Sequence, residues 1–90
     1  MPAYSLDEVL DLLDRYHQRA TYGAVGAVVD RPPYFLMAGR PCDTRHSWVV
    51  SQKTHLPTGY CEKDMHPRLR DRTEVLRTFE ELSTWLRGPR

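Results

Sequence analysis

The chain has 90 residues, of which 40% are hydrophobic and 28% are charged, and its formal net charge is +1. These values fit one soluble globular domain over residues 1–90, and no apolar run approaches the roughly 18 residues of a membrane span. The acidic, amphipathic start predicts neither a signal peptide nor a transit peptide, and two cysteines are too few for a disulfide scaffold. We therefore expect a cytoplasmic protein without membrane association.

The first predicted element is an amphipathic helix over residues 6 to 18, within SLDEVLDLLDRYHQRA. Ser5 and Glu8 have the spacing of a capping box, in which each satisfies an amide of the other. Apolar side chains recur at helical spacing, and the opposite face carries Asp7, Asp11 and Asp14.

A second helix is predicted from Tyr22 to Val29, with Thr21 as its N-cap. It is rich in glycine and alanine, which favours the close approach of another helix. After a turn at Asp30-Arg31, we expect a third helix from Pro32 to Ala38, because proline suits a first helical turn. Gly39 can end it in the left-handed conformation.

The segment HSWVVSQ is β-branched and predicts a strand, and a return strand ending near Tyr60 would complete a β-hairpin. The last helix, FEELSTWLRG, has a capping box from Thr78 to Glu81 and ends at Gly88. The predicted fold is mainly α with a small β-hairpin. Helices followed by a hairpin indicate a winged helix-turn-helix, a fold that places its third helix in a DNA groove.

Two motifs in residues 20 to 60 carry a family resemblance. TYGAVGAVVDRP matches Thr-Tyr-Gly-x-Val-Ala followed by Gly-x-Pro, and WVVSQKTHLPTGY matches Arg-Val-Val, a short turn and Gly-Gly-Tyr. The chain thus resembles the C-terminal domain of O6-alkylguanine-DNA alkyltransferases and their alkyltransferase-like relatives. The resemblance implies a helix-turn-helix that docks in the DNA minor groove and rotates a damaged guanine out of the stack. It places Tyr22 where the family's tyrosine pushes on the target phosphate; a packed aromatic at a helix start is the alternative.

The chain departs from the family at the reactive positions. The arginine that fills the gap left by the flipped base corresponds to Leu36, and the nucleophilic cysteine corresponds to His46. A leucine can wedge between bases, although Phe35, Leu36 and Met37 in a row also fit a core. Cys42 follows a proline but lies four residues too early for the nucleophile. Alkyltransferase-like proteins also lack this cysteine and bind lesions without repairing them, so we expect no enzymatic activity.

The middle of the chain is mildly basic and its ends are acidic. With the family positions, this predicts a DNA-binding set: Tyr22, Phe35, Leu36, Arg40, Arg45, His46, Trp48 and Lys53. For Trp48 the alternative is a core anchor beneath the hairpin. A rival hypothesis is a protein-interaction or structural module that contacts a partner or a second copy through Tyr34–Met37.

Cys42 with His46, and Cys61 with His66, have spacings that zinc ligands sometimes use. Structural zinc sites more often use tighter cysteine pairs. We therefore expect loop cysteines, surface histidines at His17, His55 and His66, and neither a metal nor a cofactor.

Overall fold

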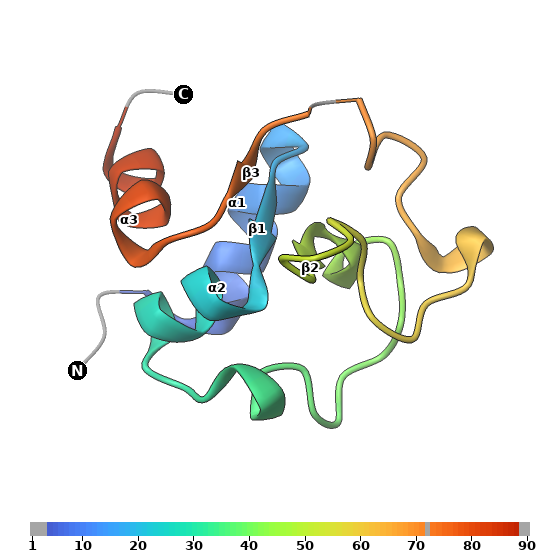
Figure 1. Cartoon of the computed structure of the whole chain (residues 1–90), viewed down its shortest axis with the longest axis horizontal. Coiled ribbons are helices and arrows are strands. Elements are labelled where there is room, and N and C mark those ends of the chain that lie inside the picture. Colours follow the sequence, from blue (N-terminus) through green and yellow to red (C-terminus); the bar gives the residue numbers. More distant parts are fainter. Residues whose placement is uncertain (1–3, 72, 89–90) are drawn as a thin grey trace.

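The computed structural model describes residues 4–71 and 73–88, and of Tyr34 only the backbone. Three helices and three very short strands make up a small compact domain (Figure 1). In chain order these are α1 (Leu6–Tyr16), β1 (Arg19–Thr21), α2 (Tyr22–Val29), β2 (Val49–Val50), β3 (Val75–Leu76) and α3 (Phe79–Arg87). Single 3-10 turns lie at Pro33–Phe35, His46–Trp48 and Glu62–Asp64. None of the helices in the described ranges is long and apolar enough to cross a membrane.

The helix α1 forms as its sequence pattern predicts. The Glu8 amide donates to Ser5 Oγ, and the Glu8 carboxylate accepts from the Ser5 amide, which completes the capping box. Its apolar stripe is buried: Leu6, Val9, Leu10 and Leu13. The helix ends at His17, which adopts the left-handed conformation at φ 53°.

The sheet is parallel, with the strand order β2-β1-β3 and β1 in the centre (Figure 1). Ala20 lies opposite Val49 on one side of β1 and opposite Leu76 on the other. The predicted β-hairpin over residues 46 to 60 is therefore wrong. Val49 and Val50 do form a strand, but its partner is β1, and the described residues from Ser51 to Tyr60 form turns.

The helix α2 begins and ends where the sequence predicts. The Thr21 hydroxyl accepts from the Ala24 amide, and Asp30 closes the helix in the left-handed conformation at φ 58°. The predicted close approach occurs at Gly26, but the neighbour is the segment that follows α2, residues 31–33, and not another helix. A Cβ at Gly26 would lie 2.6 Å from the Arg31 carbonyl oxygen and 3.5 Å from the Pro33 ring.

The predicted third helix, Pro32 to Ala38, is reduced to the 3-10 turn Pro33–Phe35 followed by further turns. Pro33 disfavours the helical conformation at the residue before it, and Pro32 has ψ 135°, so no helix begins at Pro32. The segment that remains is too short to gain many helical hydrogen bonds. Gly39 has the expected left-handed conformation at φ 78°, although it ends a series of turns and not a helix.

The C-terminal helix α3 packs against α2 and buries Leu82 and Leu86. The Glu81 amide donates to Thr78 Oγ1 as predicted, but the Glu81 carboxylate accepts from the Arg77 amide instead of that of Thr78. The segment between β2 and β3 lies on the opposite side of the molecule from α3 (Figure 1). The core thus sits between α1, α2, α3 and the sheet.

Candidate functional site

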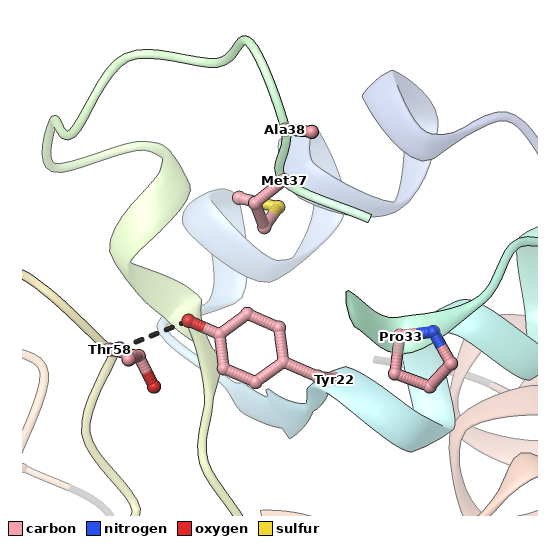
Figure 2. A pocket seen from close by; sticks show the side chains of 5 residues that line it. All are labelled: Tyr22, Pro33, Met37, Ala38 and Thr58. Carbon is pink, nitrogen blue, oxygen red and sulfur yellow. Dashed lines mark hydrogen bonds between the residues drawn. The ribbon is translucent and has the colours of Figure 1, made fainter. Parts of the chain in front are cut away.

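A pocket of about 480 Å³ lies at the start of α2, and its lining combines one phenol with mostly apolar walls (Figure 2). The lining residues are Tyr22, Pro33, Met37, Ala38 and Thr58. This volume falls within the roughly 300–1,000 Å³ of small-molecule sites. Three separate stretches of the chain meet here: the first residue of α2, the turns that follow Pro32, and the 51–60 turns.

Tyr22 is the polar centre of the pocket. Its ring lies between Pro33 and Thr58 in Figure 2, and its hydroxyl points towards Thr58. The Thr58 backbone amide donates to Tyr22 Oη at 3.0 Å. Because a phenol oxygen that accepts one hydrogen bond still carries its own proton, Tyr22 can donate to a ligand in the pocket.

The predicted DNA-binding cations Arg40 and Arg45 both contact carboxylates of α1. Arg40 Nη1 lies 3.0 Å from Asp7 Oδ1, and Arg45 Nη2 lies 3.3 Å from the same oxygen. Arg45 Nε also lies 2.8 Å from Asp11 Oδ1. The hydrogen bond from Arg40, with those from Arg45, lowers the pKa of Asp7 below its ordinary value. The acidic face of α1 is thus an ion-pairing face.

His46, which the motif resemblance aligns with the alkyltransferase nucleophile, is buried with 4% of its surface exposed. Its Nδ1 lies 2.6 Å from Asp43 Oδ1, and its Nε2 lies 3.4 Å from Arg40 Nη1. A tautomer with the proton on Nδ1 satisfies both neighbours. Burial raises the pKa of Asp43, but its hydrogen bonds with His46 outweigh this, and the net pKa is lowered. Both ring nitrogens of His46 therefore have partners other than the Cys42 thiol.

Trp48 is fully buried, so it is a core anchor, the alternative drawn from its sequence position. Its Nε1 donates to Asp14 Oδ1 at 2.8 Å. The His17 ring stacks on the indole at 5.4 Å between centroids, and the His66 ring tilts against it at 4.8 Å. The sequence predicts surface positions for His17, His55 and His66. All three are half-buried in the structure.

The remaining predicted residues divide by exposure. Leu36 is 1% exposed, so the proposed wedge between bases is not available in this conformation, and the residue belongs to the core. Phe35 is 61% exposed, and Lys53 is also exposed. Of the Tyr34–Met37 run, Met37 is half-buried at the pocket, and the Tyr34 side chain lies outside the described part of the chain.

The zinc alternative receives no support from the described residues. Within 4–71 and 73–88, no three histidine, cysteine or acidic side chains come together as a metal site. Both cysteines are exposed free thiols.

Burial raises the pKa of the Tyr60 phenol far above its ordinary value, and Cys42 acts in the same direction.

Several site residues escaped prediction from the sequence. Met37 and Thr58 line the pocket because the chain turns after Pro32 and again before Tyr60. The sequence predicts the second turn, but no local pattern shows that the two segments meet beside Tyr22. Asp7 and Asp11 were placed on the polar face of α1 without a partner. The opposite charges of this face and of the basic middle segment were visible in the sequence, but no local pattern pairs them, because the contacts span more than 30 positions.

No family model, curated protein or solved structure gives a significant match to this chain.

Proposed function

We propose that this chain is a non-enzymatic DNA-binding protein of alkyltransferase-like type, and that the pocket beside Tyr22 receives a base turned out of the duplex. The observation that carries the proposal is the pocket itself. Tyr22, the tyrosine of the Thr-Tyr-Gly motif, is the first residue of α2, and its hydroxyl can donate a hydrogen bond into the pocket. Pro33, Met37 and Ala38 form the apolar walls. Proteins that extrude a base hold it against apolar or aromatic side chains and read its polar edge by hydrogen bonds.

In this proposal, α2, the turn at Asp30 and the turns from Pro33 to Gly39 correspond to the helix-turn-helix of the family. The segment that would correspond to the family's wing, residues 51–60, forms turns and not a hairpin. It carries the exposed Lys53 and contributes Thr58 to the pocket. Two observations support the absence of alkyl transfer at the family's nucleophile position: this position is the buried His46, and its imidazole is held by Asp43 and Arg40.

The proposal is tested by fluorescence anisotropy with two labelled duplexes, one plain and one carrying O6-methylguanine, at two salt concentrations. We expect salt-sensitive binding to both, because phosphate contacts release counterions, and tighter binding to the modified duplex. Tyr22→Phe should reduce that preference while Tyr4→Phe, outside the pocket, leaves it unchanged. Absence of binding at low salt, or binding independent of salt, would overturn the proposal.

A second candidate function, a protein-interaction module, is favoured by Phe35. This phenylalanine is 61% exposed two residues after the pocket residue Pro33, and aromatic side chains are enriched in protein–protein interfaces. Sedimentation analysis distinguishes the candidates. A dimer that Phe35→Ala converts to a monomer, in a protein that binds neither duplex, supports the interaction module.

A further inference from the structure

Two arginines converge on the first two turns of α1. Arg40 Nη1 and Arg45 Nη2 both reach Asp7 Oδ1, at 3.0 Å and 3.3 Å, and Arg45 Nε reaches Asp11 Oδ1 at 2.8 Å. Arg45 Nη2 also donates to the Asp7 backbone carbonyl at 3.2 Å. Two guanidinium groups around one anionic oxygen form the arrangement with which proteins bind a phosphate.

All four side chains remain accessible to solvent. The exposed fractions are 24% for Arg40, 33% for Arg45, 61% for Asp7 and 69% for Asp11. An incoming phosphate can therefore reach the guanidinium groups without unfolding the protein. Exposed ion pairs add little to stability, so exchanging one anion for another costs little.

Arg40 also lies close to the pocket along the chain. Arg40 follows the pocket residue Ala38 by two positions, and the Arg40 amide donates to the carbonyl of Met37, another pocket residue. A duplex that delivers a base to this pocket brings its phosphates towards the same turn.

We propose that Asp7 and Asp11 are internal competitors of DNA phosphate, which occupy Arg40 and Arg45 in the free protein and are displaced when DNA binds. The inference rests on the proposed DNA binding. It makes the acidic face of α1 an autoinhibitory contact, and it accounts for a DNA-binding surface on a chain with a net charge of only +1.

The test compares the affinity of the plain duplex for wild type and Asp7→Asn/Asp11→Asn at low salt. The control is Glu74→Gln/Glu80→Gln, two exposed acids elsewhere, which changes the net charge by the same amount. We expect the α1 variant to bind several-fold more tightly than the control. The gain should vanish when Arg40→Gln/Arg45→Gln is added, since coupled residues are non-additive.

Thermal unfolding establishes that each variant is folded, and Asp11→Asn alone, which keeps the first helical turn intact, should bind with intermediate affinity. If wild type binds DNA and the α1 variant binds no better than the control, the competition is overturned while DNA binding stands. A gain that survives loss of both arginines also overturns it. If no variant binds DNA, both proposals fail. If only the α1 variant binds, the competition is supported.

Discussion

At the residue scale, the Trp48 side chain both fills the core and makes a polar contact with α1. The indole is fully buried, yet its one polar atom donates to Asp14 on α1. Buried tryptophans usually have such a partner, because an unpaired N–H in the core is costly. The same indole supports the imidazoles of His17 and His66, so residues 17, 48 and 66 form one aromatic cluster across three segments.

Trp48→Phe should lower the free energy of unfolding by about 2 kcal/mol, through a cavity and the lost bond to Asp14. Urea denaturation measures this change. Trp85→Phe is the control, since Trp85 is only half-buried on α3, and we expect it to cost less than about 1 kcal/mol. Equal losses for the two variants would contradict the role given to Trp48.

The Asp7 carboxylate predicts a pH dependence. Hydrogen bonds from Arg40 and Arg45 lower the pKa of Asp7 in the folded protein. The group therefore contributes stability above its unfolded pKa, about 3.9, and that contribution is lost as the pH falls through the lower folded pKa. The Tm difference between wild type and Asp7→Asn should be constant from about pH 7 to 5 and shrink below about pH 4. A difference that stays the same at pH 3 would show that the ion pairs are not its source.

At the element scale, the three helices that carry an N-cap were predictable, whereas the predicted helix from Pro32 to Ala38 was wrong and the sheet was not foreseen. Each helix carries its own start signal at Ser5, Thr21 or Thr78, and all three side-chain caps form, although the capping box predicted at Thr78 is incomplete. The strands have two or three residues each, too few to show an alternating pattern, and their partners are far apart in sequence. Val49-Val50 suggested a hairpin because a short β-branched segment is most simply paired with a strand close to it in the sequence. Pairing with β1 instead buries both valines completely.

The two glycines of α2 predict opposite effects from one substitution. A Cβ at Gly26 would meet the Arg31 carbonyl at 2.6 Å, and this oxygen belongs to backbone that cannot easily move. Gly26→Ala should therefore destabilise the protein by about 1–3 kcal/mol. At the exposed Gly23 the nearest atom is 4.0 Å away, so Gly23→Ala should stabilise it by about 0.5–1 kcal/mol. Thermal unfolding of both variants checks the pair; a shift of the same sign in both would refute the packing described at Gly26.

The Thr21 cap joins α2 to the chain after β3. Its hydroxyl accepts from the Ala24 amide at 3.1 Å and donates to the Arg77 carbonyl at 3.3 Å. Thr21→Ala should cost about 1–2 kcal/mol of unfolding free energy, because both bonds are lost. Thr21→Ser keeps the hydroxyl and should retain most of that stability. Guanidinium denaturation of the two variants tests this, and equal losses would mean that the methyl group, not the cap, matters.

At the scale of the whole molecule, the acidic helix and the basic middle segment fold onto each other. The sequence shows both charge groups but not their pairing, because the contacts span more than 30 positions. The same limit applies to the candidate site. Tyr22 was predicted from its motif, whereas the pocket around it depends on two distant turn segments that meet beside it, and the sequence has no local signal for that meeting. The sequence also did not decide whether Leu36 and His46 are buried.

The central claim, a base held in the Tyr22 pocket, is tested most directly by 2-aminopurine fluorescence. This base is quenched when stacked in a duplex, and its emission rises when it is turned out. With the 2-aminopurine at the target position and the protein at saturation, we expect increased emission for wild type. Ala38→Trp, which fills the pocket, should bind without the increase. Unchanged emission from wild type bound to the duplex would contradict base extrusion and leave only surface binding to DNA.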